Sequence, residues 1–158
     1  MLRKLRERQH QEGFTIIEVL IVLAIAGLIM VVVFLAVPNL ERSQRNNARK
    51  TDANNILEDL SEYVGNADGS LPGTACTGLS ACSWISYNPQ QLTNVNYYTT
   101  FASAPTTAPS SNTAYLIGGA VCSAANVLVP AASTSTRDYV IWYGVEGSTG
   151  TVCTSGTQ

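Results

Sequence analysis

The sequence has a single histidine, His10, and a single basic residue after position 51, Arg137. Ser-His-Asp or Cys-His catalysis and His-ligated metal sites need histidine in the folded region. A nucleic-acid-binding domain usually clusters Lys and Arg on its surface. Here the acidic side chains after position 51 are Asp52, Glu58, Asp59, Glu62, Asp68, Asp138 and Glu146. Residues 51–158 therefore exclude histidine chemistry and do not resemble a nucleic-acid-binding groove, and we expect no metal site, no cofactor and no enzymatic activity.

The four cysteines, Cys76, Cys82, Cys122 and Cys153, form no C-x-x-C pair, which argues against a zinc ribbon or a thioredoxin-type site. An even number of cysteines in a Ser/Thr-rich region of low charge favours disulfides in an oxidising compartment. Three connectivities are possible. We favour Cys76–Cys82, which closes a short loop, and Cys122–Cys153, which ties the last strand to an earlier one.

Residues 14–37 are almost entirely apolar and contain one carboxylate, Glu18. A helix rises ~1.5 Å per residue, so this run is long enough to cross a hydrocarbon core of ~30 Å. A carboxylate costs ~2.5–3.5 kcal/mol at the bilayer centre and less near an edge. The run therefore predicts a membrane span in which Glu18 has a specific partner.

Two ordinary interpretations of this run are weaker. A secretory signal would be cleaved after the A-x-A sequence at Ala24–Ala26, which would leave eleven further apolar residues on the secreted domain. A plain single-pass anchor explains neither Glu18 nor the residues around Gly13. Lys and Arg are balanced across the run, four on each side. The cysteines and the Ser/Thr-rich region place the N-terminus in the cytoplasm and the domain outside.

The segment from Gly13 to Leu20 closely resembles the cleavage and methylation motif of type IV prepilins and pseudopilins. It reads Gly13-Phe14-Thr15-Ile16-Ile17-Glu18-Val19-Leu20 and follows a short basic leader. The resemblance implies that a prepilin peptidase cuts between Gly13 and Phe14 and methylates the new amine of Phe14. Glycine suits the scissile position because it has no Cβ. The resemblance covers residues 1 to about 38.

Cleavage would create an α-amine on Phe14 with a reference pKa of ~8, largely protonated at neutral pH. Glu18 lies four residues later, on the same helical face. The resemblance implies that Glu18 of an incoming subunit meets the Phe14 amine of a subunit already in the filament. A buried unpaired charge is costly whereas a paired one is tolerated, so this pairing would set the stagger between subunits.

Gly27 and Pro38 interrupt the helical pattern, since both disfavour a helix interior. Many pilins loosen their helix between a glycine and a proline in the filament. Here Pro38 stands three residues after the usual family position, which Leu35 occupies. The expected helix break at Gly27 and Pro38 is therefore local melting, or a simple kink at Pro38.

Beyond the membrane, an apolar stripe predicts that the helix continues to about residue 65 and packs on a sheet. The stripe consists of Ala53, Ile56, Leu57, Leu60 and Val64. Gly65 and Asn66 are typical of a helix end. One face of this helix then carries three arginines, Arg42, Arg45 and Arg49. This face is solvated or contacts lipid headgroups, or alternatively it pairs with acidic groups of adjacent subunits. The acidic candidates are Asp52, Glu58, Asp59 and Glu62.

The remaining residues predict a small antiparallel sheet. Strand signals lie at 114–117, 120–122 and 139–145, and a turn at 147–150 leads into a strand at 151–153. Residues 66–113 are expected to form a loop-rich connection. The predicted fold is α+β and pilin-like: a leader (1–13), a transmembrane and polymerisation helix (14–37), an amphipathic continuation (38–65) and a disulfide-bonded, β-rich head (66–158).

These features together favour a structural subunit of a type IV pilus that serves surface attachment, motility or DNA uptake. The resemblance to type IV prepilins implies as partners further copies of the chain in a helical filament, the prepilin peptidase and the assembly platform in the membrane, and the apolar run implies lipid before assembly. The alternatives are a pseudopilin of a type II secretion system and a membrane-anchored extracellular binding module.

Overall fold

The computed structural model describes residues 13–123, 129–147 and 150–156, so the expected leader before Gly13 and part of the turn at 147–150 lie outside it. The described chain has one long helix and seven strands in the order α1-β1-β2-β3-β4-β5-β6-β7, with a short 3-10 helix η1 between β2 and β3. By internal contacts the chain forms two compact units, Met1–Leu40 and Glu41–Gln158. Each unit is described by itself.

The first unit contains the N-terminal part of α1 (Ile16–Asn66). Its apolar side chains are exposed along their whole length, from Phe14 at 84% to Leu40 at 60%. Among the described residues, α1 is the one helix long and apolar enough to cross a membrane. A helix that is apolar on all sides is stable only when lipid or protein surrounds it.

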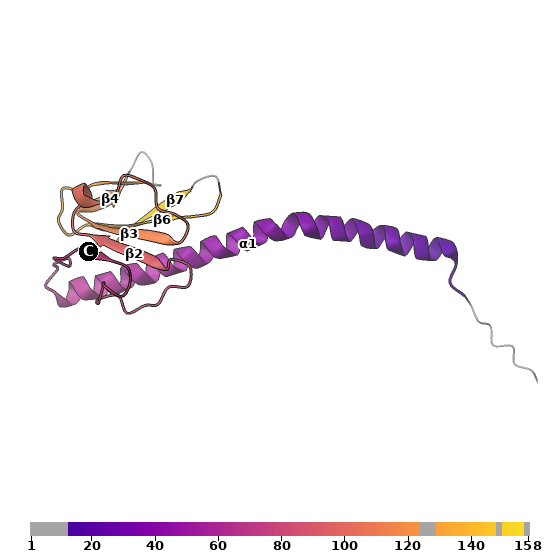
Figure 1. The fold of residues 1–158 in the computed structure, drawn as a ribbon, viewed down its shortest axis with the longest axis horizontal. Helices are drawn as coiled ribbons and strands as arrows, with labels where there is room; N and C mark the ends of the chain where they lie inside the picture. The colour runs from indigo at the N-terminus through magenta and orange to yellow at the C-terminus, as the bar shows by residue number, and fades with distance from the viewer. Residues whose placement is uncertain (1–12, 124–128, 148–149, 157–158) are drawn as a thin grey trace, which may run out of the picture. The chain divides into compact units, whose positions relative to one another are not determined.

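In the second unit, the C-terminal part of α1 packs against a five-stranded sheet (Figure 1). The strand order is β1 (Cys76–Thr77), β2 (Asn94–Tyr98), β3 (Thr113–Gly118), β6 (Tyr139–Gly144) and β7 (Thr151–Gly156). A separate two-stranded sheet pairs β4 (Ala120–Cys122) with β5 (Pro130–Ala132). The α+β layout and the strand signals at 114–117, 120–122, 139–145 and 151–153 are confirmed.

The expectation of a purely antiparallel sheet is wrong, because β2 and β3 pair in parallel, with Asn94 opposite Thr113. Parallel strands need a crossover connection, and residues 99–112, which include η1 (Phe101–Ser103), supply it. The crossover comes so close to β6 that a Cβ on Gly144 would lie 2.2 Å from the Ser110 carbonyl oxygen. Strands β1 and β2 lie inside the segment expected to be loop.

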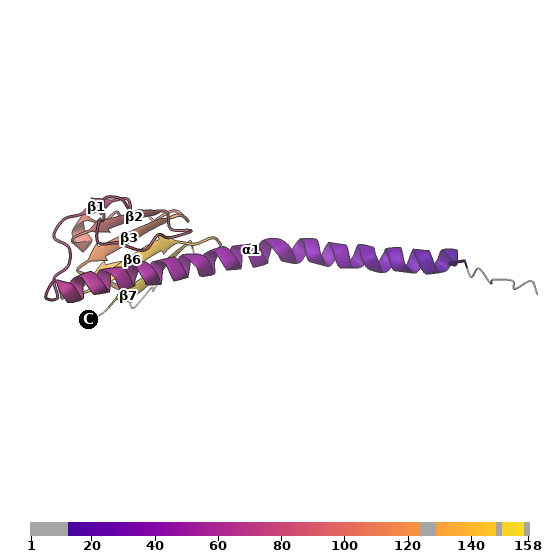
Figure 2. The same ribbon diagram turned by 90° about the horizontal axis from the view of Figure 1, so that it is seen from below.

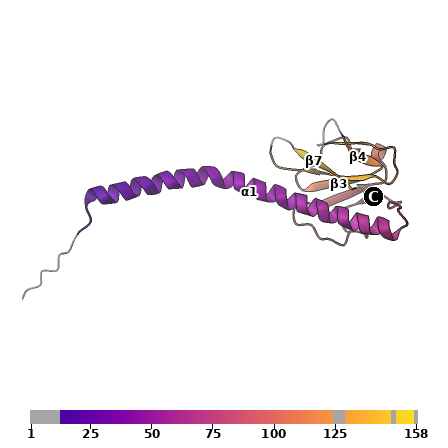
Figure 3. The ribbon, with the colours of Figure 1, turned by 180° about the vertical axis from the view of Figure 1, so that it is seen from behind.

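The core between helix and sheet follows the predicted stripe. Ala53, Ile56, Leu60 and Val64 are fully buried and Leu57 is nearly so. They pack against the sheet face that carries Val95, Tyr97, Leu116 and Ile141. The opposite face, around Ile117, Val140 and Trp142, forms a second apolar cluster. Successive side chains of β3 and β6 point to opposite faces of the sheet, which separates the two clusters. Figure 3 shows the sheet from the side opposite to Figure 1.

Two local features close the head. The helix ends at Asn66, where the expected stop lies, and Gly69, with φ +80°, donates its N–H to the Val64 carbonyl over 2.9 Å. Cys76 is bonded to Cys82 and Cys122 to Cys153, with Cα–Cα distances of 5.4 and 5.7 Å. These are the two pairings that we favour from the sequence.

Candidate processing and assembly site

The expected cleavage point lies outside the helix. Gly13, Phe14 and Thr15 are not helical, and α1 begins at Ile16. A Cβ added at Gly13 would meet nothing within 4 Å. The Gly13–Phe14 peptide bond is therefore in an exposed, non-helical segment, which is the form a peptidase needs for access to the scissile bond.

Thr15 starts the helix. Its carbonyl accepts the N–H groups of Glu18 at 3.1 Å and Val19 at 3.3 Å, and its Oγ1 accepts the Glu18 N–H at 3.3 Å. A threonine side chain that bonds the third residue of a helix is an N-cap, worth about 1 kcal/mol. Glu18 then lies in the first turn, where the helix dipole stabilises a negative charge.

The Glu18 carboxylate makes no hydrogen bond or ion pair within the part of the chain that the structure describes. It borders a shallow hollow whose other lining residues, Phe14, Val19, Val22 and Leu23, are all apolar. In the uncleaved chain the Phe14 nitrogen is an amide and carries no charge. Among residues 13–123, 129–147 and 150–156 the carboxylate thus has no cation beside it, and it is set in an apolar surface.

Residues 8–34 match the family described as the prokaryotic N-terminal methylation motif. The chain carries a type IV prepilin-like signal. The motif indicates a type IV pilin-like or pseudopilin-like protein. The match includes Gly13, Phe14 and Glu18 and ends before Pro38 and the head. No match was found among curated proteins or among solved structures.

Beyond the prepilin-like signal, α1 runs without interruption through Gly27 and Pro38 in this structure of the single chain. The resemblance predicts melting of this segment only inside a filament, so the helix break stays a prediction for the assembled state. A Cβ at Gly27 would meet nothing within 4 Å. Gly27 is therefore not required by packing within the chain.

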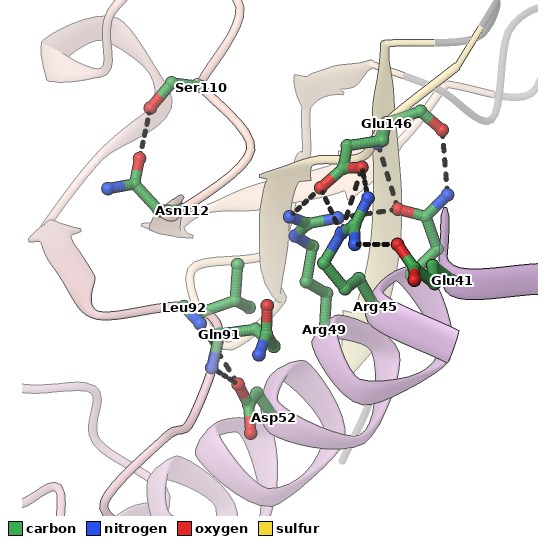
Figure 4. A network of polar contacts seen from close by, with 10 residues as sticks. Glu41, Arg45, Arg49, Asp52, Gln91, Leu92, Ser110, Asn112 and Glu146 are labelled. Carbon is green, nitrogen blue, oxygen red and sulfur yellow. Dashed lines mark hydrogen bonds and ion pairs between the residues drawn. The ribbon is translucent and has the colours of Figure 1, made fainter. Parts of the chain in front are cut away.

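Two of the three arginines expected beside the membrane are engaged within the head (Figure 4). Arg45 Nη2 lies 2.7 Å from Glu146 Oε2, and Arg49 Nη2 lies 2.6 Å from Glu146 Oε1. Asn46 Nδ2 donates to the Glu146 carbonyl at 2.8 Å, and its Oδ1 accepts the Glu146 N–H at 2.9 Å. We call this group the Glu146 clamp, and it fixes the turn after β6 on the helix.

Two of the four acidic candidates for intersubunit pairing are also engaged internally. Both Asp52 oxygens accept hydrogen bonds: Oδ1 from the Tyr87 hydroxyl and Gln90 N–H, and Oδ2 from the Gln91 and Leu92 N–H groups. Asp59 accepts the Ser86 and Tyr87 N–H groups and the Ser86 hydroxyl. Arg45 and Arg49 are therefore not the simply solvated side chains that the sequence allowed, and Asp52 and Asp59 already have partners in a later segment of their own chain.

The clamp predicts an acid-dependent stability. Hydrogen bonds from Arg45 and then Arg49 lower the pKa of Glu146 from 4.5 to about 2. A lowered pKa stabilises the fold above the unfolded value, and this contribution is lost as pH falls from 4.5 towards 2. We expect the difference in Tm between wild type and Glu146→Gln to be constant from pH 7 to 5 and to shrink below pH 4.5. Thermal unfolding at each pH measures it, and a difference independent of pH would contradict the clamp's charge.

Proposed function

We propose that this chain is the structural subunit of a type IV pilus filament, processed after Gly13, methylated on Phe14 and polymerised through residues 14–37. The observation that carries the proposal is the carboxylate of Glu18, which has no partner among the described residues. It lies one helical turn from the cleavage point, in an apolar helical segment that the rest of the described chain does not bury. Lipid can cover the apolar surface but offers the carboxylate no partner, and a charge in such surroundings is tolerated when a cation pairs with it. The Phe14 amine of a second processed copy supplies that cation.

In this proposal the chain is anchored in the membrane by residues 14–37 before assembly, with its head outside. Residues 38–65 continue the helix under the head, and residues 66–158 form the filament surface. The prepilin peptidase, the assembly platform and lipid act in turn on the same helix. Attachment, motility and DNA uptake would be properties of the assembled filament.

The two disulfides support a head outside the cytoplasm, either at the cell surface or in the periplasm, because both compartments are oxidising. Cys122–Cys153 closes a loop with a sequence separation of 31 residues, which corresponds to ~3–4 kcal/mol in the chain-entropy model. A sheared surface fraction tests the choice. A pilus releases this chain into that fraction, whereas a short periplasmic pseudopilus leaves it with the cells.

Gly13→Val tests the processing step. A β-branched side chain at the scissile position should block cleavage, so the chain keeps its leader, stays in the membrane and disappears from the sheared fraction. Gly73→Val is the matched control, since a Cβ at either glycine meets nothing within 4 Å. Immunoblots of both fractions measure the result. Normal shortening of Gly13→Val would contradict cleavage after Gly13.

A further inference from the structure

A row of exposed side chains follows the face of α1 that is turned away from the sheet. The row comprises Lys50, Asn54, Glu58 and Glu62, all exposed and spaced by four residues. Residues at this spacing form a continuous ridge on a helix surface, and such ridges pack into the grooves of neighbouring helices. In Figure 2 this part of α1 lies in front of the sheet, and no strand covers it. We call this row the exposed ridge.

The charges of the exposed ridge have no partner in the part of the chain that the structure describes. Lys50, Glu58 and Glu62 appear in no hydrogen bond or ion pair, whereas Arg45, Arg49, Asp52 and Asp59 on the same helix all do. Folding of the head therefore uses the charges that face it and leaves the ridge charges for another surface.

The signs are segregated along the ridge. Lys50 comes first, and Glu58 and Glu62 follow two and three turns later, ~12 and ~18 Å further along the axis at ~1.5 Å per residue. Two parallel copies placed level would bring like charges together. A stagger of two or three turns brings Lys50 of one copy beside Glu58 or Glu62 of the other. The ridge is thus complementary to itself only when displaced.

We propose that the exposed ridge is a contact surface for a second copy of this chain, in which Lys50 of one copy pairs with Glu58 or Glu62 of a parallel copy displaced by two or three turns. This copy is a different neighbour from the one whose Phe14 amine meets Glu18, because that pairing displaces two copies by only about one turn. This inference rests on the proposed function, because a filament built through residues 14–37 holds many copies of α1 in parallel. An anionic lipid surface does not fit the ridge, since its headgroups would repel two of the three charges. Electrostatic complementarity of this kind fixes register and rejects wrong alignments.

Charge exchange tests the ridge in cells that assemble the filament. Lys50→Glu places three acids in the row and is expected to lower the sheared filament yield about tenfold, with the amount of processed chain in the membrane unchanged. The triple variant Lys50→Glu, Glu58→Lys, Glu62→Lys restores opposite signs and should recover most of the yield. Arg137→Glu is the matched control, because Arg137 is exposed, makes no ion pair in the described residues and lies off the ridge.

Full yield from Lys50→Glu would overturn the proposal. So would a triple variant no better than the single one, or a loss from Arg137→Glu equal to that from Lys50→Glu, which would make net charge the cause. A wild-type chain that is processed but never enters the sheared fraction would contradict the proposed pilus itself. That result is distinguishable, because it appears before any ridge residue is changed.

Discussion

Glu18→Ala should leave the chain inserted and processed in the membrane and remove it from surface filaments. The substitution takes a charge out of an apolar segment, so insertion becomes easier. In the filament it leaves the Phe14 amine of the neighbouring copy buried without a partner. Loss of one member of a buried ion pair costs ~3–5 kcal/mol, which is roughly two to four orders of magnitude in the equilibrium for adding a subunit.

Two further variants separate the charge from the shape. Glu18→Gln keeps the size and the hydrogen-bonding oxygen but not the charge, and we expect a yield close to that of Glu18→Ala. Val22→Ala is the matched control, because Val22 lines the same hollow one turn later and loses only apolar contact. Quantitative immunoblots of sheared and membrane fractions measure all three. Normal filament yield from Glu18→Ala would exclude an ion pair as the register device.

Asp52→Ala should lower the free energy of unfolding of the head by ~3–5 kcal/mol, because it leaves several buried donors unpaired. Asp52 is only 2% exposed, and its two oxygens hold the backbone N–H groups of residues 90–92 and the Tyr87 hydroxyl. The hydrogen bond from the Tyr87 hydroxyl to Asp52 raises the pKa of the Tyr87 phenol. Since small domains are stable by ~5–15 kcal/mol, the loss is a large fraction of the total.

The matched control is Asp59→Ala, because Asp59 is a second aspartate on the same helix, two turns after Asp52. Asp59 binds the neighbouring Ser86 and Tyr87 but is partly exposed, so water can replace the carboxylate and the cost should be clearly smaller. Thermal unfolding of the full chain in detergent, followed by circular dichroism, measures both. Equal Tm values for wild type and Asp52→Ala would show that the carboxylate does not hold the 86–92 segment.

The sequence predicted those parts of the fold that depend on short-range pattern. The helical stripe, its end at Asn66 and the strand at 139–144 each follow from residues within a few turns or a few pleats of one another. The candidate site is also inferred from a local motif, since Gly13, Phe14 and Glu18 lie within six residues of one another, and their roles stay a prediction.

The remaining features depend on distant segments. Glu146 reaches Arg45 and Arg49 across 101 and 97 residues, and nothing near Glu146 in the sequence distinguishes it from a solvated turn acid. The sequence hints weakly that Asp52 is buried and bonded, because this carboxylate directly precedes Ala53 of the buried stripe. Strand β2 contains two asparagines among its five residues, and asparagine is depleted in strands. The strand, and with it the pairing with β3, was therefore not predicted from the sequence.

The central claim is that cleavage after Gly13 turns a membrane span into a filament core joined through Phe14 and Glu18. Mass spectrometry of the main chain in sheared surface filaments tests it most directly. We predict an N-terminal peptide that begins at Phe14 and carries a methyl group on its α-amine. A mature chain that still begins at Met1, or one that begins after Ala26, would contradict the account.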